Sequence, residues 1–151
     1  MKDHHSYGDI IVKKYIVNSS IEKLMKRFSL LQNCNSKYLL KYNDAQQVEN
    51  KLCIISEYCD WQPLSFRLGN IPVSNLAFLR LIAFSCLLGL DDLHHFAEVA
   101  HGNLKPSNIF LNDNGEVRFC DYGLEDELLR CGVRMTKKQW VYCAPEVFEG
   151  K

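Results

Sequence analysis

The chain has 151 residues, 47% of them hydrophobic, which is enough for one compact domain with its own core. Its 18 Lys and Arg balance its 18 Asp and Glu, so the zero net charge gives no general attraction to nucleic acid or to an acidic membrane surface. The polar first residues do not resemble a signal peptide, no apolar run is long enough to span a membrane, and the seven cysteines form no Cys-x-x-Cys pair, which together favour a cytoplasmic protein.

The first third of the chain has the pattern of strands around one helix. Residues 9–17 are rich in β-branched and aromatic types, which indicates a strand. The polar run 18–20 supplies cap residues, and apolar positions at helical spacing then predict an amphipathic helix over 21–31. We interpret the next segments as an antiparallel strand pair with a polar connecting turn: strands 38–42 and 52–57, and turn 44–50.

The rest of the chain is predicted to be mainly helical. Residues 58–73 are irregular and rich in Pro and Gly, so they form the most plausible internal boundary. A helix follows residue 74, and because its apolar residues occupy more than one face, we expect it to be buried in a core. Residues 108–111 and 117–120 flank an Asn-Gly turn, which predicts a β-hairpin.

Three short motifs surround this hairpin in a fixed order. They are His-Gly-Asn-Leu-Lys-Pro-Ser-Asn at 101–108, Asp-Tyr-Gly at 121–123 and Ala-Pro-Glu at 144–146. This order resembles the catalytic half of protein kinases, where a His-Arg-Asp loop with a downstream Asn is followed by Asp-Phe-Gly and Ala-Pro-Glu. Upstream, Ile-Ile-Val-Lys at 10–13 is similar to the lysine strand of that family, and Glu-Tyr-Cys at 57–59 to its hinge.

The resemblance implies a two-lobed, protein-kinase-like α+β fold over nearly the whole chain. Residues 9–57 would form the strands and regulatory helix of the N-lobe, 58–73 the hinge region, and 74–151 the C-lobe through the activation segment. Too few residues precede the lysine strand to supply a glycine-rich loop, and the later helices of the large lobe do not follow. We therefore expect residues 1–151 to be a partial kinase domain.

The resemblance also implies roles for single residues, with ATP and Mg²⁺ as the ligands that they would hold. Asn108 and Asp121 carry oxygen atoms suited to Mg²⁺. Lys105 matches the catalytic-loop lysine of serine/threonine kinases. The positions implied for nucleotide contact are Lys13, Ile11, Glu57, Cys59 and Phe110. The positions implied for structure or regulation are Arg27, His101, Tyr122 and Glu146.

Several residues depart from the kinase pattern. Asn103 stands at the position of the proton-accepting aspartate, and a carboxamide has no useful basicity near neutral pH. Gly102 replaces the arginine that couples this loop to a phosphorylated activation segment. Arg27 stands where the lysine-pairing glutamate belongs, and a cation there would repel Lys13. Glu22, more than a turn earlier, could substitute only if the helix were rotated.

Ordinary structural interpretations compete with these roles. Lys13 alone could be a solvated strand lysine, Asp121 the end of a strand and Asn108 a turn former; only their joint placement around the hairpin points to a metal site. We expect a catalytically impaired, pseudokinase-like module that binds protein partners and allows nucleotide binding without turnover. The alternatives are a weakly active serine/threonine kinase and a truncated, inert fragment.

Overall fold

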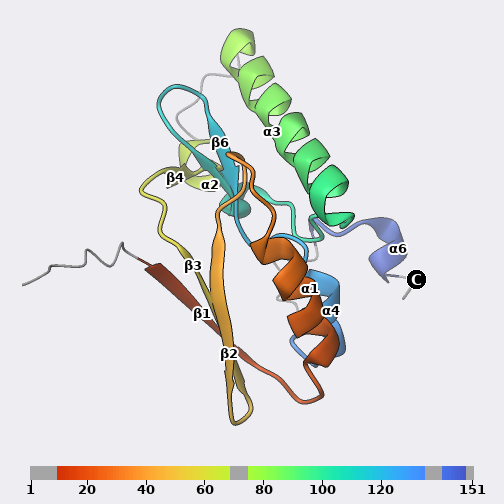
Figure 1. Ribbon diagram of the computed structural model, residues 1–151. Helices are drawn as coiled ribbons and strands as arrows, with labels where there is room; N and C mark the ends of the chain where they lie inside the picture. Colours follow the sequence, from red (N-terminus) through yellow and green to blue (C-terminus); the bar gives the residue numbers. More distant parts are fainter. Residues whose placement is uncertain (1–9, 69–74, 135–140, 149–151) are drawn as a thin grey trace, which may run out of the picture.

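The computed structural model describes residues 10–68, 75–134 and 141–148, and its elements build two packed parts (Figure 1). The elements in chain order are β1 (Ile10–Ile16), α1 (Glu22–Gln32), β2 (Tyr42–Val48), β3 (Lys51–Glu57), β4 (Gln62–Pro63), α2 (Leu64–Arg67), α3 (Leu76–Ala97), the 3₁₀ turn η1 (Pro106–Asn108), β5 (Ile109–Leu111), β6 (Val117–Phe119), α4 (Glu125–Arg130) and α6 (Pro145–Phe148). One part contains the antiparallel sheet β1-β3-β2 with α1, and the other contains the sheet β4-β5-β6 with α3.

The first sheet corrects the prediction for residues 38–50. Strand β2 occupies most of the stretch that was predicted to be a turn, and the turn itself is only residues 49–50, with Glu49 at a φ of 56°. The polar composition misled because β2 is an edge strand that buries only Tyr42 and Ala45 and exposes the rest to water. The predicted strand 38–42 lies mostly outside the sheet, where Leu39 forms an isolated bridge to Phe119.

Helix α1 confirms the predicted helix but not its cap. The N-cap position is Ile21, and Ser20 lies one residue earlier, where its hydroxyl accepts a long hydrogen bond of 3.4 Å from the Glu22 amide. Apolar spacing places one face of α1 against β2, and the side chains that this face buries are Leu24, Phe28 and Leu31. The helix therefore forms because of its apolar face rather than because of a strong cap.

Helix α3 begins at an N-cap, Asn75, whose side chain accepts a hydrogen bond from the Phe78 amide at 3.2 Å. Only one of its faces is buried, so the prediction of a helix enclosed by a core is wrong for the outer face. Large apolar side chains are exposed there: Leu76, Leu81, Phe84, Leu87 and Phe96. On the buried face Gly89 lies so close to the Phe119 ring that an added Cβ would be 2.7 Å from it. No helix in the described ranges is long and apolar enough to cross a membrane.

The predicted hairpin is confirmed as β5 and β6, which pair antiparallel. Its loop covers residues 112–116, where the Asn112 carboxamide accepts hydrogen bonds from the backbone amides of Asn114 and Glu116 and Gly115 takes a φ of 79°. The segment 58–73 is less irregular than expected, because β4 adds a third strand to this hairpin and α2 follows it. Residues 69–74 of that segment lie outside the described residues.

Two tyrosines join the two parts through one continuous hydrophobic core. The hydroxyl of Tyr122 donates to the Leu40 carbonyl at 2.8 Å, and the hydroxyl of Tyr42 donates to the Tyr122 carbonyl at 3.0 Å. Their rings lie 4.7 Å apart, and the Phe28 ring of α1 lies 5.4 Å from Tyr42. Burial raises the pKa of both tyrosines, so both hydroxyls stay protonated and able to donate.

The tyrosine link can be measured by thermal unfolding. Tyr122→Phe keeps the ring but leaves the buried Leu40 carbonyl without its donor, so we expect a loss of about 1–3 kcal/mol, or several degrees in Tm for a domain of this size. Tyr58→Phe is the matched control because Tyr58 is 51% exposed, and it should change Tm by no more than about a degree. Equal effects of the two substitutions would contradict a specific link through Tyr122.

Candidate active site

An ion pair between Lys13 and Asp121 connects the two parts at the centre of the candidate site. Burial alternates along β1, so Ile11, Lys13 and Tyr15 share the half-buried face of the strand. The Lys13 ammonium contacts the Asp121 carboxylate across 108 positions of sequence, and the two side chains are 37% and 22% exposed. The lysine predicted from the strand motif and the aspartate predicted from the hairpin motif therefore meet in space.

The backbone after β6 fixes the position of Asp121. Asp121 itself has a φ of 55° and Gly123 a φ of 72°, so the chain turns sharply between β6 and α4. The Gly123 amide donates to the His101 carbonyl at 2.8 Å, and an added Cβ at Gly123 would lie 3.0 Å from Leu31. A residue with a Cβ would be strained at this positive φ and would crowd Leu31, so position 123 requires glycine.

His101 is a buried anchor of the loop that carries Asn103. Its Nδ1 accepts the Asn103 amide at 3.3 Å, and its ring meets Phe119 edge-on at 5.3 Å and Tyr122 at 6.3 Å. Burial lowers the pKa of His101 to about 4, so the imidazole is neutral at physiological pH. A neutral, packed ring of this kind positions the loop and does not carry charge into the site.

Asn108 brings the two ends of the site together. Its side-chain Nδ2 donates to the Asn103 backbone carbonyl at 2.9 Å. The backbone carbonyl of Asn108 accepts a hydrogen bond from the Cys120 amide at 3.0 Å. The residue is only 4% exposed. Asn103, Asn108 and Asp121 are therefore neighbours, and the Asn108 Oδ1 accepts only a long hydrogen bond of 3.5 Å from the Ser107 hydroxyl.

The Arg27 side chain does not face Lys13. Its guanidinium lies 3.3 Å from the Asp126 carboxylate and 3.6 Å from the Glu127 carboxylate, both in α4. The repulsion expected between Arg27 and Lys13 is thus avoided, because each cation has a carboxylate of its own. Glu22 does not replace the missing helix glutamate, since it pairs with Lys26 on the surface at 3.0 Å.

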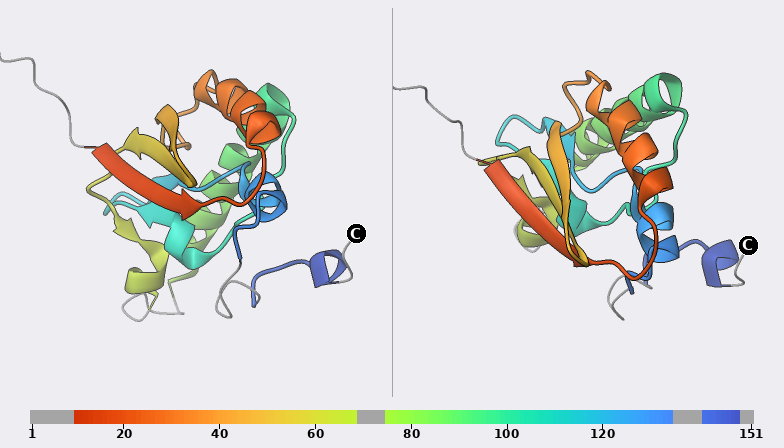
Figure 2. Two further views of the ribbon diagram at one scale, coloured as in Figure 1. Left: turned by 90° about the horizontal axis from the view of Figure 1, so that it is seen from below. Right: turned by 60° about the horizontal axis from the view of Figure 1, so that its bottom comes forward.

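Helix α4 is held tightly against α1 and the sheet (Figure 2). The Asn18 amide donates to the Cys131 carbonyl at 2.8 Å, and the Ser19 hydroxyl to the Arg130 carbonyl at 3.2 Å. Between α4 and the sheet there remains a cavity of only about 10 Å³, bordered by Tyr15 and Asp121. That volume is at most enough for one water molecule, so little space is left between α4 and the sheet beside Asp121.

The remaining predicted residues lie around this centre. Ile11 pairs with Ser56 across β1 and β3, and Phe110 is half-buried in β5 opposite Pro63. Glu57 turns its carboxylate toward Arg118, at 3.6 Å, and its backbone amide donates to the Lys41 carbonyl at 2.9 Å.

Three further predicted residues differ in their surroundings. Cys59 is buried, and burial raises the pKa of its thiol. Lys105 is half-buried. Burial raises the pKa of Glu125, and the positive charge of Lys105 partly offsets that rise. Glu146 lies exposed in α6 and forms no ion pair with any residue that the structure describes.

Sequence reasoning missed the acidic partners of Arg27. Glu125, Asp126 and Glu127 begin two residues after the Asp-Tyr-Gly motif, and this run of three acids was a usable signal. A cation at Arg27 and acids after the motif are what a helix-to-helix ion pair needs. The missing information was that α4 packs against α1 at all.

Stability measurements can test whether the Arg27 ion pairs hold α1 and α4 together. Arg27→Met removes the guanidinium and leaves Glu127, whose side chain is 6% exposed, with one fewer cation; we expect a loss of about 1–3 kcal/mol. Lys26→Met is the control, because its exposed pair with Glu22 is worth no more than about 0.5 kcal/mol. Chemical denaturation would compare the two variants, and a loss for Arg27→Met no larger than the control would contradict the contact.

Comparison with known proteins places this site in a family. A family model described as the protein kinase domain matches residues 2–151. A dual specificity mitogen-activated protein kinase kinase of Drosophila melanogaster is 26% identical over 99% of this chain, and a serine/threonine-protein kinase of Caenorhabditis elegans is 30% identical over 97% of it. A serine/threonine-protein kinase 4 homolog of Dictyostelium discoideum is 29% identical over 94%. The chain spans 39%, 30% and 13% of the lengths of these three relatives, respectively. The chain belongs to the protein kinase family, and the match to its domain runs through every segment of the candidate site.

Proposed function

We propose that this kinase domain is catalytically impaired and acts as a binding or regulatory module that can still hold a nucleotide. The observation that carries the proposal is the carboxamide of Asn103 at the position where the family has its proton-accepting aspartate. Phosphoryl transfer needs the substrate hydroxyl to lose its proton to a nearby base. An amide oxygen can orient that hydroxyl, but it cannot take the proton at neutral pH.

The surrounding loop supports a loss of chemistry rather than a loss of structure. The backbone of Asn103 is held from both sides, by the His101 imidazole and by the Asn108 carboxamide. The loop geometry is thus kept while the basic group is absent. A binding module requires an ordered loop of this kind but does not require a basic group at Asn103.

The cation arrangement gives a second, independent line of support. In an active kinase the strand lysine is held by a helix glutamate and contacts the nucleotide phosphates. Here Lys13 is held by Asp121, and Arg27 is held by the carboxylates of α4. Productive phosphate binding would require Lys13 to leave Asp121, and α1 offers it no carboxylate in exchange.

The oxygen donors nevertheless fit a Mg²⁺–nucleotide complex. Asp121 and Asn108 would hold Mg²⁺, Lys13 would meet the phosphates, and Ile11, Phe110 and the backbone at Glu57 and Cys59 would enclose the base. Bound Mg²⁺ would neutralise phosphate charge. It would also compete with the Lys13 ammonium for Asp121, so we propose that nucleotide binding releases that ion pair.

Nucleotide binding can be tested by thermal shift with Mg-ATP. We expect a dose-dependent rise in Tm, since a ligand at a hundred times its Kd stabilises by about 2.7 kcal/mol. Asp121→Asn should abolish the ligand-dependent part of the rise, because it removes the charge that binds Mg²⁺. Asp113→Asn is the control, since the Asp113 side chain is 92% exposed in the hairpin loop. The same shift in both variants, or none in the unaltered protein, would refute this part of the proposal.

Catalytic impairment can be tested with radiolabelled ATP, Mg²⁺ or Mn²⁺ and a broad panel of protein and peptide substrates. We expect incorporation no greater than in the Asp121→Asn variant, because neither protein has a base at position 103. Incorporation that the unaltered chain supports and Asp121→Asn abolishes would overturn the proposal. It would instead establish the second candidate, a weakly active serine/threonine kinase, which is favoured by the retained positions of Lys105, Asn108 and Asp121.

A third candidate, an inert fragment, rests on the small share of its relatives that this chain covers. The continuous core and the tyrosine link argue against it, because both need only residues within this chain. One cooperative thermal transition in the isolated chain would argue against the inert fragment.

We further propose a cytoplasmic location, from the chemistry of the thiols. Six cysteines, from Cys34 to Cys131, form no disulfide in the part of the chain that the structure describes. Burial raises the pKa of Cys86 to about 11 and that of Cys120 to about 12, so these thiols stay protonated and behave as small apolar groups. Free thiols in these positions suit a reducing compartment.

A further inference from the structure

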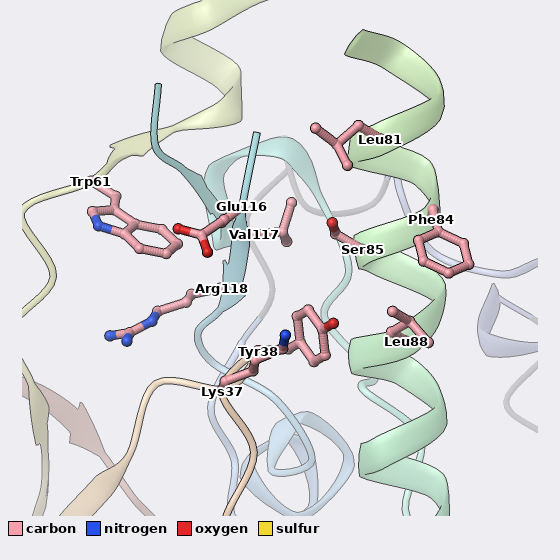
Figure 3. Close-up of a pocket in the computed structure, with 10 residues that line it drawn as sticks. All are labelled: Lys37, Tyr38, Trp61, Leu81, Phe84, Ser85, Leu88, Glu116, Val117 and Arg118. Carbon is pink, nitrogen blue, oxygen red and sulfur yellow. The ribbon is translucent and has the colours of Figure 1, made fainter. Parts of the chain in front are cut away.

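Two pockets meet on either side of the Arg118 side chain. One has a volume of about 310 Å³ and lies between α3 and β6 (Figure 3); the other, of about 440 Å³, lies between Arg118 and the segment after α1. Arg118 and Lys37 line both, so the two pockets form one groove, which we call the rear groove. Among the candidate active-site residues only Glu57 lines it, so the rear groove is separate from the Lys13–Asp121 centre.

The half of the rear groove beside α3 is mainly apolar. Trp61 lies on one side, and helix α3 contributes Leu81, Phe84 and Leu88 on the other (Figure 3). Phe84 is 60% exposed, so a large apolar surface is open to water here. Such a surface between rigid elements is suited to take up a large apolar side chain.

The other half of the groove is cationic, with Lys37, Lys41 and Arg118 along it. The Glu57 carboxylate is already satisfied by the Arg118 guanidinium and by the Lys41 backbone amide, at 3.6 and 3.1 Å. The ammonium groups of Lys37 and Lys41, in contrast, form no ion pair with any carboxylate in the described ranges; Lys37 rests over the Tyr38 ring, 4.9 Å from its centre. These two ammonium groups are unpaired there, while the one further carboxylate of the groove, that of Glu116, accepts a hydrogen bond from the Asn112 carboxamide.

Arg118 joins the two halves. Its guanidinium stacks on the Trp61 ring with the carbon 4.9 Å from the ring centre, and its Nε is buried without a hydrogen-bond partner. The ion pair of the guanidinium with Glu57 is long, at 3.6 Å, so its terminal nitrogens can still donate to an incoming anionic oxygen. Stacking on Trp61 holds the guanidinium in place for such a contact.

We propose that the rear groove binds a peptide segment of a partner protein in which a large apolar side chain stands beside acidic or phosphorylated residues. The apolar side chain enters between Trp61 and α3, and the anionic group meets Lys37, Lys41 and Arg118. The same three cations repel basic segments, which gives the groove its selectivity. This inference rests on the proposed role as a binding module and names the chemistry of its partner.

The test is selection of a random seven-residue peptide library against the full chain, followed by fluorescence polarisation of the enriched peptides. We expect enriched sequences to pair Phe, Trp or Leu with Asp or Glu, and their affinity to fall as salt rises. Replacing each acid by phosphoserine should preserve or tighten binding, and replacing it by lysine should abolish binding. Enrichment of basic peptides, or of none, would overturn the inference.

Matched variants locate the binding on the groove. The double change Lys37→Glu with Lys41→Glu should weaken binding at least about tenfold, because both attractive charges become repulsive. Phe84→Ala should also weaken it, whereas Phe96→Ala, 66% exposed on the same helix but outside the groove, should not. Lys23→Glu serves as the charge control on α1. Affinity unchanged by both groove variants would refute the site.

The outcome is independent of the catalytic proposal. Phosphate transfer would disprove impairment without affecting peptide binding, and failure of peptide binding would leave the absence of a base at Asn103 unchanged. Unaltered Tm in the groove variants separates a lost contact from a lost fold, and Lys37→Arg with Lys41→Arg should retain affinity because both charges remain.

Discussion

The contact between Lys13 and Asp121 is the constraint on which the candidate site depends. It ties the first strand of the chain to the segment after the last one, and it does so at the residues expected to meet phosphate and metal. Because Lys13 has this partner, Arg27 in α1 does not face a free cation. The second set of ion pairs, from Arg27 to α4, then holds α1 and α4 together. The two sets of contacts stabilise the same arrangement of the two parts.

In this arrangement the cations pair with other carboxylates than those used in the family's reaction. Active kinases join strand and helix through a lysine and a glutamate, whereas in the proposed correspondence both positions carry cations, and each cation finds its carboxylate between Asp121 and Glu127. The site is thus internally neutralised without a ligand. In the proposed correspondence with the family, the missing base at Asn103 and the missing helix carboxylate at Arg27 are separate changes, and restoring either one would leave the other.

The sequence predicted the elements whose local pattern is strong. The helix from Glu22, the long helix α3 and the hairpin around Asn112 follow from apolar spacing and turn chemistry, and the motifs around the hairpin led to the kinase fold. Strand β2 was missed because an edge strand with one solvated face is polar in sequence and resembles a turn. The partners of Arg27 and Lys13 were missed because each lies about a hundred residues away, and only tertiary packing brings them near. The open outer face of α3 was missed for the same reason, since helical spacing does not reveal which face is covered.

The reciprocal hydroxyl contacts of Tyr42 and Tyr122 have a consequence for motion. The Tyr42 hydroxyl donates to the backbone of Tyr122, and the Tyr122 hydroxyl donates to the backbone of Leu40, two residues before Tyr42. A rotation that moves these two segments apart would therefore stretch both contacts. Separating the two parts at this point would therefore break both buried hydrogen bonds together.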